Sequence, residues 1–222
     1  MAVSAVNVKA VFTASIGRKI VMAITGLFLC TFLIAHLSGN LLLLKNDGGI
    51  AFNEYSEFMV HSPLIRVAEF ILLFGILFHI VFGIQLILKN NKSRPVGYKV
   101  SKAGQNSTFY SRFMSYSGIA VLLFIIIHLT HFFWPHRVLG EEASMYDTAV
   151  ALFKQPAYSI FYLVSFVLLS FHLAHGVQSG FQSLGLQVSP KMQRRFKAIG
   201  WGFAILICAG FSTIPIYFLG FQ

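Results

Sequence analysis

The sequence has few charged residues and very few acidic ones. Charged residues make up 11% of the 222, against about a quarter in a soluble globular domain, and Asp and Glu together number only 7. A water-soluble fold is therefore disfavoured, and a lipid bilayer is the expected solvent. In contrast, 56% of the residues are hydrophobic and 24 are phenylalanine, which suits contact with lipid or the walls of a macrocycle pocket.

Cysteine is also scarce, and neither a cleavage site nor a soluble domain is present. Cys30 and Cys208 each lie within an apolar run, and no CxxCH motif exists for covalent attachment of a c-type haem. We therefore expect two packed thiols rather than a disulfide or a thiolate metal site.

The first apolar run is long and lacks a small-residue cleavage site, which predicts a retained membrane span. Any catalysis in water would have to come from a partner.

Five apolar stretches are long enough to cross about 30 Å of hydrocarbon at about 1.5 Å per residue. Polar segments rich in Gly, Asn, Pro and Lys separate them. The sequence thus predicts an all-α integral membrane protein in a single domain of five transmembrane helices. The predicted spans are about 20–44, 64–88, 113–134, 157–180 and 197–219.

The distribution of charge predicts the direction of these helices. If the N-terminus is cytoplasmic and the C-terminus outside, the cytoplasmic segments hold most of the 17 basic residues, as the positive-inside rule requires. All 7 acids then fall outside or in the outer turns of the second span. Because the basic residues are scattered between apolar segments, the net charge of +10 indicates membrane lipid rather than nucleic acid as a partner. The cytoplasmic basic residues are Lys9, Arg18, Lys19, Lys89, Lys92, Arg94, Lys99, Lys102, Arg112, Lys191, Arg194, Arg195 and Lys197; Lys45, Arg66, Arg137 and Lys154 remain outside.

The loop before the second span has apolar residues at helical spacing. Residues 51–62 (AFNEYSEFMVHS) are too few to cross a membrane. We expect a short amphipathic helix that lies along the outer surface.

Six of the eight histidines lie inside the predicted spans. An imidazole in hydrocarbon needs a hydrogen-bond partner or a metal, and intramembrane ionisable residues are candidates for function. An interhelical hydrogen bond would explain one such residue equally well, but six on four helices favour a cofactor. The six are His36, His79, His128, His131, His172 and His175; His61 and His136 fall at the outer interface, where a solvated role is expected.

Helix direction sorts these histidines by depth. His36 and His128 lie six to eight residues before the outer ends of spans one and three, and His79 and His172 lie eight or nine residues before the inner ends of spans two and four. Six-coordinate haem takes one imidazole from each side of the ring, so each layer can hold one haem b. The layers are roughly 10 Å apart along the helices. We expect a haem-binding four-helix bundle with the fifth helix peripheral.

Two further histidines compete for these roles. His131 and His175 each follow a candidate ligand by three residues, on nearly the same face of the helix. By spacing they could replace His128 and His172, although depth slightly favours the latter.

Several other residues are candidates for supporting roles. Small residues let a porphyrin lie against a helix, although plain helix packing explains them equally well. Arg or Lys at the inner face could pair with haem propionates, although the positive-inside bias explains these residues equally well. Glu69 lies two turns into span two as a lone charge, where it could transfer protons at an outer quinone site or extend to the interface. The glycines are Gly39, Gly75, Gly83, Gly118 and Gly176, and the candidate propionate partners are Arg18, Lys19 and Arg112.

The order and spacing of these segments are similar to the cytochrome b membrane-anchor subunit of succinate:quinone oxidoreductases and fumarate reductases, in the class with one polypeptide, five helices and two haems. The resemblance spans nearly the whole chain. It is carried by FLIAHLSGN around His36, AFNEYSEFMVHSP before span two, FHIVFGIQLILKNN around His79, SGIAVLLFIIIH ending at His128, and FHLAHGVQSGFQSLGLQVSP with KMQRR around His172.

The resemblance implies that His36 and His128 bind the outer, distal, low-potential haem and that His79 and His172 bind the inner, proximal, high-potential one. It favours His172 over His175. It also implies a flavoprotein subunit with FAD and an iron–sulfur subunit on the cytoplasmic side, a quinone substrate, commonly menaquinone, and a bacterial cytoplasmic membrane. A dimer of the whole complex is compatible with it. The inner loops 89–102 and 191–197 are placed to dock the soluble subunits, and Glu69, Glu54 or Glu57 could exchange protons with the quinone.

Two other functions are compatible with buried histidines. A dihaem anchor of a formate dehydrogenase or hydrogenase would use the same ligands and differ in the subunits that co-purify. A histidine-rich ion transporter would usually also bury carboxylates near the middle of the membrane, whereas the only acid within a predicted span here is Glu69.

Overall fold

The computed structural model describes residues 15–92, 109–140 and 143–220, and within these ranges it contains helices and no strand. Five helical segments are long and apolar enough to cross a membrane. They are Ile16–Leu44, Pro63–Lys89, Phe113–Leu139, Pro156–Ser183 and Pro190–Gly220. The prediction of an all-α fold with five candidate membrane spans is therefore confirmed.

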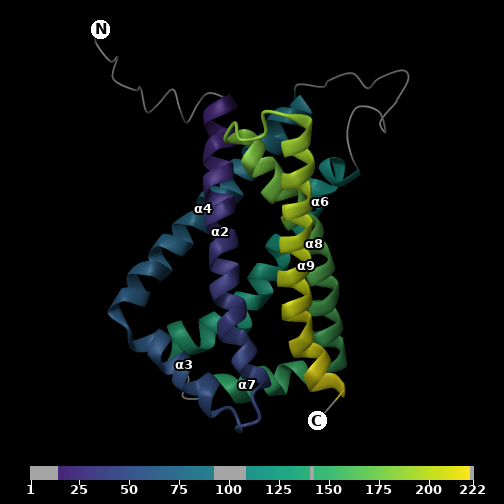
Figure 1. The fold of residues 1–222 in the computed structure, drawn as a ribbon. Helices are drawn as coiled ribbons and strands as arrows, with labels where there is room; N and C mark the ends of the chain where they lie inside the picture. The colour runs from purple at the N-terminus through teal and green to yellow at the C-terminus, as the bar shows by residue number, and fades with distance from the viewer. Residues whose placement is uncertain (1–14, 93–108, 141–142, 221–222) are drawn as a thin grey trace.

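Three long helices, those of the first, fourth and fifth spans, run roughly along one direction, the helices of the second and third spans cross them obliquely, and two short helices lie at one end of the group (Figure 1). The first span consists of α2 (Ser15–Asn40) and a short 3-10 turn, η1 (Leu41–Leu44). The others are α4 (Pro63–Lys92), α6 (Phe109–His128) with its continuation η2 (Leu129–Leu139), α8 (Pro156–Ser183) and α9 (Pro190–Gly220). The two short helices are α3 (Ile50–His61) and α7 (Met145–Phe153).

The third span continues past the proline at which it was expected to end. Pro135 lies inside η2, an 11-residue π-helix. Proline cannot donate a backbone hydrogen bond, but its carbonyl oxygen accepts one from the N–H of Gly140, which ends the segment with φ +67°. The wider π-helical turn thus carries the span through Pro135 to Leu139. Pro190 likewise begins α9 earlier than expected, as suits proline in a first helical turn.

The expected surface helix is present as α3, and α7 packs against it, although α7 was not predicted. Asn53 of α3 joins the two, because its side-chain oxygen accepts hydrogen bonds from the Ser144 hydroxyl and the Tyr146 backbone N–H, each 3.1 Å long. Gly49 precedes α3 with φ +88°. A side chain there would be strained and would also meet the Tyr146 ring at 2.3 Å, so glycine is required at this turn.

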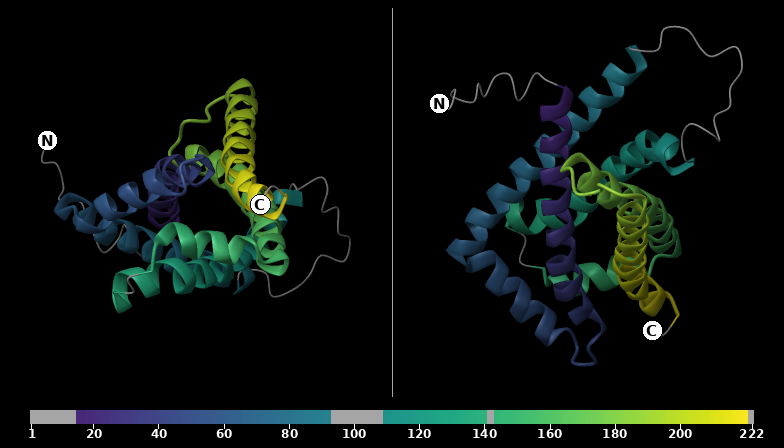
Figure 2. Two further views of the ribbon diagram at one scale, coloured as in Figure 1. Left: turned by 90° about the horizontal axis from the view of Figure 1, so that it is seen from below. Right: turned by 45° about the horizontal axis from the view of Figure 1, so that its top comes forward.

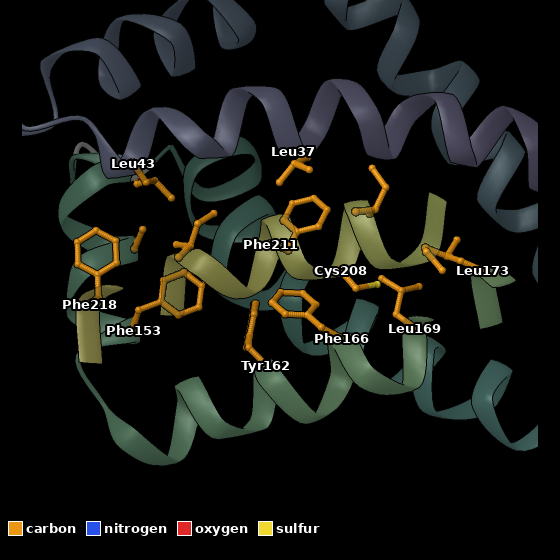
Figure 3. Close-up of a cluster of buried hydrophobic side chains, with 14 of the residues drawn as sticks. Leu37, Leu43, Phe153, Tyr162, Phe166, Leu169, Leu173, Cys208, Phe211 and Phe218 are labelled. Carbon is orange, nitrogen blue, oxygen red and sulfur yellow. The ribbon is translucent and has the colours of Figure 1, made fainter. Parts of the chain in front are cut away.

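The apolar core lies between α2, α8 and α9, with side chains from α7 and η1 at its end (Figure 3). Phe211 of α9 stacks on Phe166 of α8 with ring centroids 5.7 Å apart, and Leu37 of α2 packs against the same cluster. Because lipid tails are as apolar as these side chains, close van der Waals packing rather than the hydrophobic effect holds them together. This core fixes α2, α8 and α9 relative to one another.

The remaining two long helices are attached to this core. In Figures 1 and 2, α4 leaves α3 at a distance from the core and then crosses α2, with which it is in contact. The main long-helix neighbour of α6 is α8. The four helices that carry the intramembrane histidines therefore form two contacting pairs, α2 with α4 and α6 with α8, which are joined by contacts between α2 and α8. The fifth, α9, carries no histidine, but it packs along α8 and contributes Phe211 and its neighbours to the apolar core, so it is not the peripheral helix that was expected.

Candidate functional site

His36 of α2 and His128 of α6 are brought together near the end of the bundle where α3 and α7 lie. Their ring centroids are 5.8 Å apart, and the ring planes are inclined at 83°. The two residues are far apart in the sequence and come from helices in different pairs. Their approach therefore depends on the packing of α2 and α6 onto the common neighbour α8.

His79 of α4 and His172 of α8 form a second, similar pair. Their ring centroids are 6.2 Å apart, with ring planes at 70°. The two pairs use all four helices once each. Among the described residues, no group of three or more His, Cys, Asp or Glu converges as a metal site would require, so these imidazoles meet in twos.

Both separations suit a metal ion between the rings. Bonds of about 2 Å from the metal to each imidazole nitrogen, with the ring radii added, place the two centroids roughly 6 Å apart. The observed 5.8 and 6.2 Å agree with this value. A set of two opposed imidazoles, with the other positions left to a planar macrocycle, is the ligand set of six-coordinate haem.

The second ring nitrogen of each inner histidine contacts a hydroxyl group. Thr25 Oγ1 lies 3.3 Å from His79 Nδ1, and its proton is directed to the carbonyl oxygen of Val21 at 2.8 Å. Ser117 Oγ lies 3.5 Å from His172 Nδ1 and donates to the carbonyl oxygen of Met114 at 3.0 Å. Each hydroxyl oxygen is thus available to accept from Nδ1–H. This tautomer leaves Nε2 with a free lone pair, as a metal ligand needs.

In the outer pair the two histidines differ. His128 Nδ1 lies 3.1 Å from the hydroxyl of Tyr162, which can accept its proton. His36 Nδ1 instead faces the amide nitrogen of Asn40 at 3.3 Å, while the same nitrogen donates to the His36 carbonyl oxygen at 2.8 Å. For His36 to bind a metal through Nε2, the Asn40 side chain must turn its oxygen toward Nδ1–H.

Two glycines leave room beside the inner pair. A Cβ at Gly26 of α2 would lie 3.1 Å from Cε1 of His79, and one at Gly118 of α6 would lie 3.6 Å from Cε1 of His172. Gly118 was among the glycines named from the sequence, whereas Gly26 was not. The other four face different neighbours: Gly39 faces Tyr55, Gly75 faces Phe28, Gly83 faces Met22 and Gly176 faces Met114.

Aromatic rings surround the outer pair. Phe32 stacks on His36 with centroids 5.1 Å apart, and Phe211 contacts the same ring at 5.6 Å. Phe124 and Phe132 contact His128 at 5.8 and 5.3 Å. These rings make an apolar environment of the kind that a macrocycle requires.

The competing histidines are placed differently from the four paired ones. Nδ1 of His131, which is exposed on η2, lies 3.4 Å from the hydroxyl of Tyr158. His175 has no ring contact or hydrogen bond among the described residues. His61 Nδ1 lies 2.9 Å from the carbonyl oxygen of Glu57, and His136 Nε2 lies 3.2 Å from Thr148 Oγ1. None of these four opposes a second imidazole as closely as the paired histidines do.

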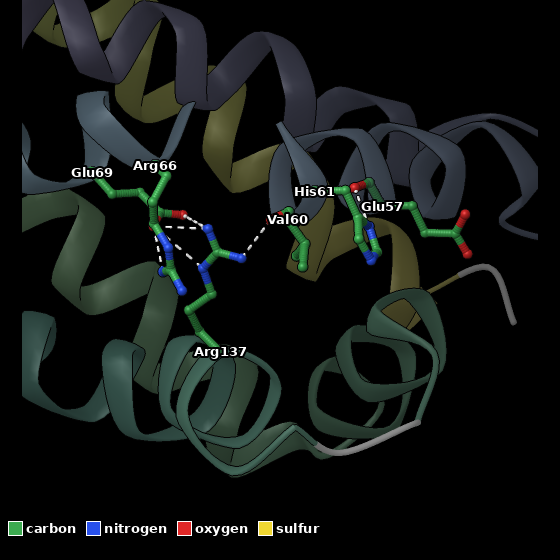
Figure 4. A network of polar contacts seen from close by, with 6 residues as sticks. All are labelled: Glu57, Val60, His61, Arg66, Glu69 and Arg137. Carbon is green, nitrogen blue, oxygen red and sulfur yellow. Dashed lines mark hydrogen bonds and ion pairs between the residues drawn. The ribbon is translucent and has the colours of Figure 1, made fainter. Parts of the chain in front are cut away.

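Glu69 is not a lone charge, contrary to the expectation from sequence. Arg137 of η2 reaches both of its carboxylate oxygens at 2.9 Å, and Arg66 contacts Oε2 at 2.9 Å (Figure 4). Arg137 also donates to the carbonyl oxygen of Val60 at 2.6 Å. Sequence reasoning missed this partner because Arg137 lies beyond the proline at which the third span was expected to end. Glu54 and Glu57 are exposed on α3.

The predicted propionate partners lie at the opposite end of the bundle. Arg18 and Lys19 are in the first turns of α2, with Arg18 partly buried and Lys19 exposed. Arg112 is in the first turn of α6, and its side chain lies outside the described part of the structure. The hydroxyl partners of the histidines, Thr25, Ser117 and Tyr162, were also missed, because nothing in their local sequence distinguishes them from ordinary helix residues.

Two comparisons with known proteins identify the family of the chain. Residues 90–211 match the family of succinate dehydrogenase/fumarate reductase transmembrane subunits. The chain is 30% identical over 174 residues to the succinate dehydrogenase cytochrome b558 subunit of Bacillus subtilis (strain 168), covering 73% of this chain and 76% of that one. No solved structure matches. The chain therefore belongs to the succinate dehydrogenase/fumarate reductase transmembrane subunit family and is a multi-pass membrane cytochrome b subunit of that enzyme complex.

Proposed function

We propose that this chain holds two b haems, an outer one between His36 and His128 and an inner one between His79 and His172. The observation that carries the proposal is that both pairs have ring centroids about 6 Å apart (5.8 and 6.2 Å), the separation that a shared metal ion requires. For His79, His128 and His172 a hydroxyl oxygen lies at Nδ1 and favours the tautomer that binds metal.

The two haems, when bound, would carry single electrons between an iron–sulfur subunit and quinone across the bilayer. The chain's own part is to hold the rings in two layers and to keep their surroundings apolar. The proposal assigns the chain to the dihaem, five-helix class of membrane anchors in a bacterial cytoplasmic membrane.

The soluble partners in this proposal are a flavoprotein subunit with FAD and an iron–sulfur subunit on the cytoplasmic side. The inner end of the bundle carries exposed basic side chains at the start of α9, including Lys191, Arg194, Arg195 and Lys197. Complementary charge would orient an acidic partner surface there. The positive-inside distribution supports the same orientation.

We place the quinone site at the outer end, near the His36–His128 pair, with menaquinone as the expected substrate. Among the described residues, Glu69 is the acid that lies inside a candidate span, and a proton-transfer role would require it to exchange its Arg66 and Arg137 contacts for the substrate. Glu54 and Glu57 are the exposed alternatives. If Glu69→Gln leaves quinone turnover and its pH dependence unchanged, Glu69 has no such role.

The decisive experiment counts haems in the purified complex. We expect two b haems per chain in the wild type, and one each in His36→Ala and His79→Ala, by pyridine haemochrome assay and reduced-minus-oxidised spectra. His131→Ala and His175→Ala are matched controls, because each removes an intramembrane imidazole outside the pairs, and both should retain two. Loss of a haem from a control, or two haems in either ligand variant, would refute the ligand pairs.

Membership of this family favours succinate or fumarate chemistry over an anchor of formate dehydrogenase or hydrogenase. A histidine-based ion transporter is disfavoured, because Glu69, the one acid in a candidate span among the described residues, is ion-paired at the outer end. A reduced-minus-oxidised spectrum without a b-type α band would revive that function.

A further inference from the structure

Tyr162 of α8 is a buried phenol in direct contact with one of the paired histidines. Only 3% of its surface is exposed, and its hydroxyl oxygen lies 3.1 Å from His128 Nδ1. Its ring is enclosed by Phe124 at 5.0 Å, Phe153 at 5.1 Å and Phe166 at 5.9 Å, all three nearly perpendicular to it. This packing fixes the hydroxyl at the His128 ring.

The hydrogen bonding continues beyond Tyr162 to the surface of the bundle. The hydroxyl of Tyr158, one turn earlier on α8, lies 2.9 Å from the Tyr162 hydroxyl. Tyr158 in turn lies 3.4 Å from Nδ1 of His131, which is exposed. A chain of polar groups therefore runs from an exposed imidazole through two phenols to the buried His128.

The donors and acceptors of this chain can be assigned. A His128 that binds metal through Nε2 carries its proton on Nδ1 and donates it to the Tyr162 oxygen. The Tyr162 hydroxyl then directs its own proton to the Tyr158 oxygen 2.9 Å away. The strength of the bond from His128 thus depends on a second hydroxyl, because a hydroxyl that donates its own proton becomes a stronger acceptor.

The inner pair lacks such an extension. Thr25 and Ser117 donate only to carbonyl oxygens of their own helices, those of Val21 and Met22 and that of Met114. Their contacts with His79 and His172 end there among the described residues. The two candidate haem sites therefore differ in the hydrogen bonds that continue from the Nδ1 partner of the histidine, although their imidazole pairs are alike.

We infer that Tyr162 is a positioning residue that sets the reduction potential of the outer haem through the Nδ1–H of His128, and that Tyr158 strengthens its effect. The inference rests on the proposed function. A hydrogen bond from Nδ1–H to an oxygen raises the basicity of the imidazole and stabilises the ferric state, which lowers the potential. Tyr162 thereby keeps the outer haem more reducing than its ligands alone would make it.

The test is a potentiometric titration of the b-type α band in the whole purified complex, with haem content measured in parallel. Tyr162→Phe should move one of the two haem components to a more positive potential while two haems remain bound. Tyr158→Phe should move the same component by a smaller amount in the same positive direction, because the Tyr162 hydroxyl, which can no longer donate to Tyr158, then accepts less strongly. Thr25→Val, the matched control at His79, should shift the other component only.

Each outcome is decisive. If Tyr162→Phe leaves both potentials unchanged with two haems bound, or moves the same component as Thr25→Val, the inference is wrong while the proposed function stands. A wild-type complex without two b haems overturns the proposed function instead. If Tyr162→Phe fails to assemble, Tyr158→Phe decides, since an unchanged or more negative potential contradicts the donor order.

Discussion

Arg137 and Glu69, 68 positions apart in the sequence, form the ion pair that joins η2 to α4. Arg137 contributes Nε at 3.2 Å and Nη2 at 2.9 Å to one carboxylate oxygen, and its side chain is 9% exposed. Arg66 contacts the same carboxylate but is 51% exposed. Glu69 is thus paired with one buried arginine and one exposed arginine.

Arg137→Met should destabilise the outer end of the bundle, whereas Arg66→Met should have little effect. Loss of the buried arginine removes charged hydrogen bonds worth about 1.5–3 kcal/mol each before compensation, so we expect a net loss of about 1–3 kcal/mol. The exposed pair is worth at most about 1 kcal/mol. Thermal unfolding of the detergent-solubilised complex measures both. Equal losses in the two variants would contradict this difference.

Gly200→Ala should separate α9 from α8. A Cβ at this position would lie 2.6 Å from the backbone carbonyl oxygen of Ala174, which cannot move without its helix. Overpacking of this kind costs about 1–3 kcal/mol. Gly202→Ala is the control, because it is on the same helix with no atom within 4 Å of the new Cβ. It should be neutral or slightly stabilising, and a similar loss in both variants would show that helix contact is not the cause.

Gly26→Ala should disturb the inner haem and leave the outer one intact. Its Cβ would lie 3.1 Å from Cε1 of His79, so the imidazole must shift by a few tenths of an ångström away from α2. We expect a lower content or an altered α band of one haem component, measured by spectroscopy of the purified complex. Gly83→Ala, whose Cβ would meet only the flexible end of Met22 at 3.6 Å, should be unchanged. The prediction fails if the two variants have the same spectrum.

Asp47 should make the loop between η1 and α3 sensitive to acid. Partial burial opposes its ionisation, but hydrogen bonds from the backbone N–H groups of Ala51 and Gly49 and the neighbouring Lys45 lower its pKa below the ordinary value. A pKa that is lower in the folded state stabilises the fold above the unfolded pKa of about 3.9, and this contribution is lost as the pH falls through the folded value.

Asp47→Asn should therefore reduce the acid dependence of unfolding below about pH 4, since the amide cannot titrate. Thermal unfolding of the complex measured over a pH series checks this. Glu54→Gln provides the charge-matched control from the exposed surface of α3, and its pH profile should follow that of the wild type. An unchanged profile in Asp47→Asn would mean that these hydrogen bonds do not favour the carboxylate in the folded state.

Much of the site could be predicted because depth in a membrane helix follows from counting residues. His36 and His128 were paired by their distance from the outer ends of their spans, and the structure brings these two rings to 5.8 Å. The hydroxyl partners could not be found in this way. Tyr162 reaches His128 through the packing of α6 on α8, and this contact has no local sequence signal.

The amino-acid sequence by itself determined the solvent, the five spans and the sorting of histidines into two layers, since hydropathy, charge bias and helix rise are properties of the chain. Only the tertiary structure decided which groups contact the Nδ1 atom of each paired histidine, that Arg137 neutralises Glu69, and that η2 continues through Pro135 as a π-helix. These features depend on side chains from separate helices and on the backbone adjusting to them. The physical reason is that an isolated helix fixes depth and face, whereas the partner across an interface is set only when the helices pack.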